Sequence, residues 1–505
     1  MDEEKVERLL REAKNFIPVD QQLKKTLRKS FEKKRKRKPT RVYGITVAAA
    51  LLFLSIIVTS LQSRPVNANE LLVTHAISFV DVARGNIHTM IQNDGNIYVT
   101  MKNGESFILS EKGLTKTEAV KSSPTVETDK FKLYEEQGNI IKENLKNNEK
   151  TIVDQGHSPS ISMSGDYIAY IKKENDFDQV WIADTDLETK KQLTSNLLQR
   201  EVDLPLYEYR TPVWGEDNTI YLVKDRLYDT EIVETTVMKI GLGTESLSSE
   251  ETVDQFMQAL MVRDDDYAKS LMVSPPEFLT VSNPRITGYQ IISVKDEFVQ
   301  VEVTRSDSHL PYTSIDQYEF RLNKVDGRYK IEDVSEINTL LVSSDDMKTL
   351  QITQNGETKD LISINQLDKN QIKSGNYRLS STYYNSKKNV IYFGVQEMGE
   401  ETSGVSIWSY DIQREKLEFL LRINQPKVLL ESMIQSPNGK YLALNLFPDS
   451  SETPFVYVVD LEQQTFEIAN AYIQYWNGET MMVDTVHDQY RTLQPVDIQN
   501  LEPIK

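Results

Sequence analysis

The feature that most constrains this chain is a stretch without charge near its N-terminus. Residues 42–61 read VYGITVAAALLFLSIIVTSL, twenty residues with no Asp, Glu, Lys or Arg. A helix of that length is about 30 Å long at about 1.5 Å per residue, which matches the hydrocarbon core of a bilayer. Eleven Lys or Arg lie within residues 24–41, against the single acid Glu32. A buried core helix would not have such a flank, so we expect a transmembrane helix over residues 42–63.

The charges on the two sides of this segment predict its orientation. Arg64 is the single Lys or Arg in the twenty residues after the span. Basic residues are retained on the cytoplasmic side, so we expect the N-terminus inside and the bulk of the chain outside. Val66-Asn67-Ala68 offers small residues to a signal peptidase, but a 41-residue leader is unusual, so we favour a retained anchor. The expected location is the cell membrane, in a single pass.

Composition separates the two sides further and excludes several chemistries. Residues 1–41 carry fifteen basic and seven acidic side chains, a balance of +8, which leaves −26 for the rest of a chain whose total is −18. The chain has no cysteine, which excludes disulfides, thiolate metal sites and cysteine nucleophiles. Its five histidines show no HxxxH spacing: His75, His88, His157, His309 and His487. We therefore expect no metal and no cofactor.

The cytoplasmic head, residues 1–41, is predicted to form short amphipathic helices around Pro18. One apolar stripe in it is too narrow to form a core, so it lies on lipid, on the other short helix or on a partner protein. The basic run beside the membrane attracts anionic headgroups, which explains its charge without nucleic acid. The candidate contact residues are Leu23, Leu27, Phe31, Lys33, Lys34, Arg35, Lys36, Arg37 and Lys38.

Beyond the span, a pattern of short strands recurs. Residues 158–194 contain a turn at Ser164-Gly165-Asp166, strands at 167–171 and 180–183, and a polar hairpin. The same order recurs at 435–468 and 385–420, with a weaker copy at 212–240 and fainter units at 85–119, 122–156, 347–378 and 472–500. Four short strands per 40–50 residues are typical of propeller blades.

These repeats resemble the TolB-type propeller family, whose blades read SPDGxxIAF, then IWxxD, then xxLT. The copy at 158–194 has Ser164-Gly165-Asp166 in place of SPDG, and residues 436–439 read SPNG. The resemblance covers about two thirds of the chain and implies architecture, not a ligand.

An insert interrupts the repeats at residues 248–336. Ser248 and Glu251 form a capping-box pattern, and a second short helix is expected over 264–272. Strands are expected at 286–294, 298–304, 317–322 and 328–334, with a turn at Asp326-Gly327. Helix, helix and curved antiparallel sheet resemble the cone-shaped nuclear transport factor two-like (SnoaL-like) fold.

Enzyme motifs were sought among the residues of both modules. No GxSxG elbow exists, and the nearest string, around Ser406, lacks the second glycine. His309 stands in a polar stretch that reads as a loop, and His487 stands alone in the terminal repeat. Asp264, Asp265 and Asp266 stand at a helix start, where acids stabilise the helix dipole. The four tryptophans occupy repeat positions that favour core packing: Trp181, Trp214, Trp408 and Trp476. We expect no catalysis.

The sequence thus predicts a mainly β chain: a six- or seven-bladed β-propeller interrupted by a small α+β domain, after one transmembrane helix and a helical head. The expected ranges are a head at 1–41, a span at 42–63, a linker at 64–84, propeller halves at 85–247 and 337–505, and an insert at 248–336. The expected function is an extracytoplasmic binding protein or sensor for a protein, peptide or cell-envelope ligand. The alternative is an anti-sigma-factor-like regulator whose head binds a cytoplasmic regulatory protein, although the HxxxCxxC motif of zinc-type heads is absent.

Overall fold

The computed structural model describes residues 67–501, except for 84, 94, 111–112, 119–125, 175, 195–205, 217, 229–230, 277–278, 280–282, 373–374, 399–403, 426, 449–452, 462–464 and 488–489. The chain divides into two compact units, 1–65 and 66–505. The predicted head and span lie outside the described residues. Within the described part, no helix is both long and apolar enough to cross a membrane.

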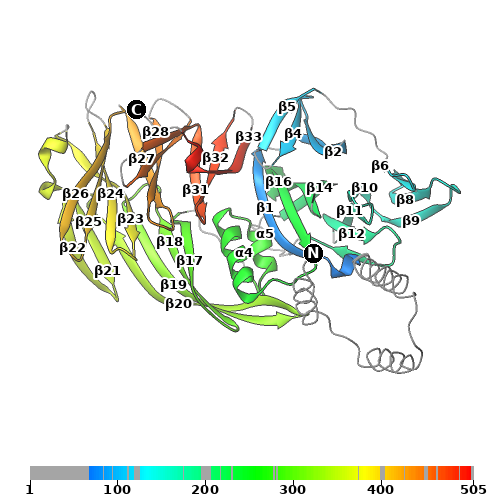
Figure 1. Cartoon of the computed structure of the whole chain (residues 1–505), viewed down its shortest axis with the longest axis horizontal. Coiled ribbons are helices and arrows are strands. Elements are labelled where there is room, and N and C mark those ends of the chain that lie inside the picture. Colours follow the sequence, from blue (N-terminus) through cyan, green and yellow to red (C-terminus); the bar gives the residue numbers. More distant parts are fainter. Residues whose placement is uncertain are drawn as a thin grey trace, which may run out of the picture. The chain divides into compact units, whose positions relative to one another are not determined.

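Five of the sheets are four-stranded antiparallel meanders, each made from one continuous stretch of chain (Figure 1). Their strands are β2 (Ile87–Asn93), β3 (Asn96–Met101), β4 (Ser106–Ser110) and β5 (Gly113–Thr117); β6 (Val126–Glu127), β7 (Phe131–Glu136), β8 (Asn139–Asn144) and β9 (Lys150–Gln155); β10 (His157–Ile161), β11 (Tyr167–Glu174), β12 (Phe177–Asp184) and β13 (Lys190–Gln192); β23 (Tyr377–Asn385), β24 (Val390–Glu397), β25 (Gly404–Asp411) and β26 (Lys416–Ile423); and β27 (Val428–Gln435), β28 (Tyr441–Pro448), β29 (Phe455–Asp460) and β30 (Thr465–Ala469). This order is that of propeller blades.

The sixth sheet has seven strands, in the order β14-β15-β16-β1-β33-β32-β31. Its strands are β1 (Leu72–Val82), β14 (Leu206–Trp214), β15 (Thr219–Tyr228), β16 (Glu231–Gly243), β31 (Ala471–Asn477), β32 (Thr480–Val486) and β33 (Tyr490–Val496). Strand β1 pairs with β16 on one side and with β33 on the other. In Figure 1, β1 (blue) therefore lies between β16 (green) and β33 (red). This central sheet therefore joins two three-stranded groups from distant parts of the chain. Strand β1 and the 3-10 turn before it (Ala68–Glu70) fall within the range expected as a linker.

The seventh sheet has six strands and includes the region expected as an insert. Its strands run in order: β17 (Arg285–Lys295), β18 (Phe298–Ser306), β19 (Tyr312–Val325), β20 (Arg328–Ser343), β21 (Thr349–Gln354) and β22 (Glu357–Ser363). The turn between β19 and β20 has positive φ at both Asp326 and Gly327, as the sequence predicts. The expected boundary at 336/337 falls inside β20. This strand pairs with β19, which pairs in turn with β18, and its residues 340–343, beyond the expected boundary, also pair with β21.

Helix α4 (Ser249–Met261) packs on this sheet, and helix α5 (Asp265–Ser270) packs on α4. Ser248 accepts a hydrogen bond from the Glu251 amide and the Glu251 carboxylate accepts one from the Ser248 amide, so the predicted capping box is confirmed. Val253, Phe256 and Met257 are buried, because they lie on one face of α4.

Neighbouring sheets pack against one another along the chain. In the second half of the chain, β19 contacts β23, β23 contacts β27, β28 and β29 contact β31, and β31 returns to β17. These sheets therefore close a ring. In the first half, β7 contacts β10, β10 contacts β14, and β14 contacts β2.

Aromatic side chains fill the spaces between and within these sheets. Trp214 stacks on Tyr167 of the neighbouring sheet with ring centroids 5.9 Å apart, and Trp476 stacks on Tyr441 at 6.4 Å. Trp408 is buried against Phe419 within its own sheet. The predicted core role of these three tryptophans is confirmed, while Trp181 is half-buried beneath the ammonium of Lys172.

Candidate functional site

A row of polar side chains crosses one face of the central sheet. Directly opposed partners on neighbouring strands share a face. The row runs from Tyr209 of β14 to Lys224 of β15, Thr236 of β16, Asp81 of β1 and Arg491 of β33, each paired in register with the next. Asp484 joins it, since Val486 pairs with Arg491 and residues two apart on a strand share a face. The row thus passes from the first half of the chain to the second through β1.

At the β14–β15 end of this row, every charge meets an opposite charge or a hydrogen bond. The Lys224 ammonium contacts the Asp264 carboxylate at 2.6 Å, and both side chains are almost fully buried. Asp264 also caps α5 by accepting from the Tyr267 amide, and Tyr209 donates its hydroxyl hydrogen to Asp266. Burial alone would lower the pKa of Lys224, but the effects of Asp264, Asp266 and Tyr207 together outweigh it and the pKa is raised. Burial raises the pKa of Asp266 to about 6.

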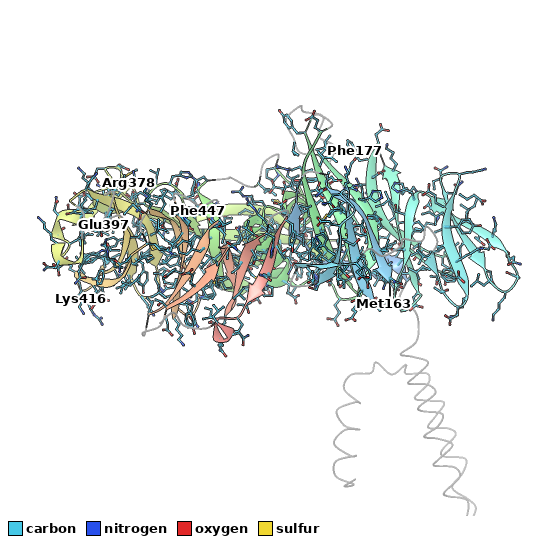
Figure 2. All side chains as sticks on the ribbon, turned by 90° about the horizontal axis from the view of Figure 1, so that it is seen from above. Met163, Phe177, Arg378, Glu397, Lys416 and Phe447 are labelled. Atoms are coloured by element: carbon cyan, nitrogen blue, oxygen red, sulfur yellow. The ribbon has the colours of Figure 1, made fainter. Side chains whose placement is uncertain are left out.

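At the β1–β33 end, the row opens into a cavity of about 520 Å³. Residues of β1, β16, the end of α4, β17, β18, β27 and β31–β33 line it, and so do loop residues beside them. Its charged lining residues are Asp81, Glu234, Glu431 and Asp484, together with Arg263, Arg285, Arg305 and Arg491. Phe79, Phe447 (labelled in Figure 2) and Tyr472 add aromatic surface. The volume lies within the roughly 300–1,000 Å³ of small-ligand sites.

A chain of contacts fixes one wall of this cavity. The Arg285 guanidinium stacks over the Tyr472 ring at 4.6 Å and donates to the Gln474 side-chain oxygen at 2.9 Å. Gln474 donates to Asp484 at 2.7 Å, and the Tyr472 hydroxyl donates to Glu431 at 3.1 Å. Arg285 is therefore held in one orientation by neutral groups.

Charges on the cavity wall are only partly paired. Arg226 pairs with Glu234 at 2.8 Å and Arg305 with Asp316 at 3.1 Å. Within the described ranges, no ion pair within 4.0 Å forms at five other lining residues: Asp81, Glu431, Asp484, Arg285 and Arg491. The wall thus holds unpaired groups of both signs.

The pKa values of the three unpaired acids reflect this arrangement. Desolvation and then Glu234 raise the pKa of Asp81 to about 6, although its side chain remains accessible to solvent. Desolvation also raises the pKa values of Asp484 and Glu431, against the opposing effects of Gln474 and Arg285 respectively. Burial raises the pKa of Tyr472 to about 12. A cation placed next to any of these acids would stabilise its ionised form.

The residues considered for catalysis lie apart from one another. His309 is exposed in the loop before β19 and its ring contacts Ser308, while Ser406 is buried in β25 and accepts from the Trp408 indole. His487 stacks on Tyr490. The contact residues predicted in the head, 23–38, lie outside the described residues.

Sequence reasoning did not single out the cavity residues. Asp81, Arg285, Tyr472, Asp484 and Arg491 come from five strands, β1, β17 and β31–β33, which lie in three separate parts of the chain. The one local signal is a charged residue at alternate positions of strands that are otherwise apolar, such as Asp484 in MMVDTV. That signal also describes any strand with one solvated face.

Comparison with models of known protein families finds no match, and neither does comparison with curated protein sequences. Among solved structures, an oligogalacturonate lyase in complex with manganese matches at 8% identity over 71% of this chain and 83% of that chain, with a TM-score of 0.24. The β-propeller domain of the trilobed protease from Pyrococcus furiosus matches at 12% identity over 75% and 96%, with a TM-score of 0.17. An acylaminoacyl peptidase from Pyrococcus horikoshii matches at 11% identity and a TM-score of 0.23, over 85% of this chain and about half (52%) of that one. At these TM-scores the likeness carries no inference about activity, and the blade architecture rests on the strand order described above.

Proposed function

We propose that this chain is a membrane-anchored extracytoplasmic binding protein that holds a peptide or other cell-envelope ligand in the cavity beside β1. The observation that carries the proposal is that this cavity has both charged and aromatic walls and lies where the two halves of the chain meet in one sheet. Apolar surface with a few fixed polar groups is the usual composition of a ligand site.

The place of β1 in the chain adds a second support. Strand β1 begins at Leu72, shortly after the predicted span, and contributes Ser78, Phe79, Val80 and Asp81 to the cavity wall. A ligand in the cavity would therefore contact the strand nearest to the anchor. This arrangement suits a protein that reports on what it binds.

A binding role is favoured over catalysis by the chemistry of the lining. The described residues around the cavity include no histidine, lysine or cysteine, and the hydroxyl of Ser78 is engaged with Asp264 and Thr236. The hydroxyl of Ser308 contacts the ring of His309, but that ring is exposed, and no carboxylate among the described residues orients it through its other nitrogen. Nucleophilic catalysis needs a nucleophile beside a base that is free to take its proton.

Capture of envelope fragments tests the binding role. The full chain in detergent, immobilised, is incubated with solubilised envelope fragments, and retained material is identified by mass spectrometry. We expect specific retention that is lost in Val486→Trp, which fills the cavity, and kept in Ile292→Trp, an exposed strand position outside it. Equal retention by the two variants would place binding elsewhere, and no retention by the wild type would overturn the proposal.

The topology is tested separately. Protease added to cells without their wall should digest epitopes beyond residue 80 and spare one within residues 1–30, because of the asymmetric basic charge. Protection of the C-terminal region would reject the extracytoplasmic placement.

A second candidate function is signal transfer to a cytoplasmic regulator, favoured by the stripe Leu23, Leu27 and Phe31 and by the acids of residues 2–12. An anionic membrane surface repels carboxylates, so these acids do not favour binding to lipid. Leu27→Asp should then abolish co-purification of a specific protein with the head. Salt-sensitive liposome binding without such a protein would assign the stripe to lipid.

A further inference from the structure

The unpaired charges of the cavity point to the chemistry of its ligand. Among the described residues, the contacts of the Arg285 guanidinium are all with neutral groups: the Tyr472 ring, the Gln474 amide oxygen and, at 3.4 Å, the Ile473 carbonyl oxygen. Its remaining hydrogens have no acceptor in this part of the chain, and a guanidinium held by stacking is well suited to a carboxylate. The wall therefore presents a fixed anion-binding group.

The same cavity also presents a group that can bind a cation. Glu431 already accepts from Tyr472 and Asp484 from Gln474. Asp81, by contrast, accepts no hydrogen bond from any residue in the described part of the chain, although it faces Arg491 across the β1–β33 pair. Its two oxygens are therefore available to an ammonium group.

Resting on the proposed function, we infer that the ligand class of this cavity is a short peptide with both ends free, whose carboxylate binds Arg285 and whose ammonium binds Asp81. A ligand with one charge would leave the other of these two groups without a partner, whereas a zwitterion neutralises both. The aromatic surface of Phe79, Phe447 and Tyr472 lies in the same cavity, and it accommodates side chains between the two ends.

Separate blocking of the two peptide ends tests this inference. Calorimetry on the full chain in detergent uses three probes: a randomised tripeptide mixture with free ends, the same mixture N-acetylated, and the same mixture C-amidated. We expect apparent affinity for the free mixture, and a loss of about 10- to 100-fold on blocking either end, from the usual strength of hydrogen bonds to charged groups.

Two variants assign each end to its residue. Asp81→Asn should bind the free and acetylated mixtures equally, and Arg285→Gln should bind the free and amidated mixtures equally. Arg321→Gln is the matched control, because Arg321 is exposed, pairs with Glu332 at 3.3 Å and does not line the cavity. Thermal unfolding without peptide verifies that each variant is folded, and Arg285→Lys, which keeps the charge, replaces Arg285→Gln if the latter is not.

Each other outcome overturns the inference. Equal affinity for the three mixtures, sensitivity to only one end, or no binding of any mixture all exclude a ligand held at both ends. The proposed function survives these results if envelope fragments are still retained in a manner that Val486→Trp abolishes. Loss of that retention, with peptide binding absent as well, would overturn both.

Discussion

The two ends of the polar row across the central sheet differ in how their charges are compensated. At one end, Lys224 and Asp264 form a buried ion pair that joins strand β15 to helix α5. At the other end, Asp81, Asp484 and Arg491 share the same sheet face without forming an ion pair within the described residues. The same face of one sheet therefore contains a closed, paired site and an open, unpaired one.

The paired end stabilises the fold, whereas the unpaired end is available to a ligand. A buried pair fixes the position of its elements, because removing one partner leaves an uncompensated charge in a dry site. Unpaired charged groups around a cavity do not stabilise the folded state, and they remain free to contact a ligand. Substitutions at the two ends should therefore have opposite effects on stability and on binding.

The largest effect is expected at the paired end. Lys224→Met leaves Asp264 without its cation and should destabilise the chain by about 3–5 kcal/mol. Denaturant unfolding of the full chain in detergent, followed by tryptophan fluorescence, measures this. The exposed Lys359→Met on β22 is the control, with an expected change within about 0.5 kcal/mol. A cost below about 1 kcal/mol for Lys224→Met would remove the contrast between the two ends.

An intermediate effect is expected from pH. The pKa of Asp81 is about 6 in the folded chain, above that of an unfolded aspartate, so the native state binds more protons between these values. Stability should therefore fall as pH rises from about 4 to about 6, and Asp266 contributes in the same direction. Asp81→Asn should flatten this dependence and raise the melting temperature at pH 7 relative to the wild type. A slope unchanged by Asp81→Asn would assign the titration to other groups.

The smallest effect on stability is expected for Arg491. Its side chain is exposed, and exposed charges interact weakly across water. Arg491→Gln should change the free energy of unfolding by less than about 1 kcal/mol, measured in the same denaturant experiment. A larger loss would show that this arginine has a structural role, and that the open end resembles the paired end.

Local patterns in the sequence predict the regular parts of this fold well. The turn at Asp326-Gly327 and the capping box of Ser248 with Glu251 depend on residues within a few positions of each other, and both are present. The strands predicted at 167–171 and 180–183 are present within β11 and β12, which pair directly with each other because they are near neighbours in sequence. Such features need no knowledge of the rest of the chain.

Strand β1 and the cavity could not be predicted in the same way. The partners of β1 are β16 and β33, and both lie far from β1 in sequence, so no hairpin or turn signal marks the pairing. Asp81 becomes a site residue only when Arg285 and Asp484 are folded beside the same cavity. The length of β20 could not be predicted either, because its residues 340–343 pair with β21 beyond the expected boundary.

The position of β1 has a consequence for the order of folding. Strand β1 is made before every other described strand, but β33, one of its two partners, is made last. Pairing between strands so far apart in sequence closes a long loop, and such contacts form slowly. During synthesis β1 must therefore remain paired with β16 alone, with its other edge uncovered, until β33 has been made. Strand edges left open in this way are prone to wrong pairing, so the pairing of β33 with β1 also protects the chain from association.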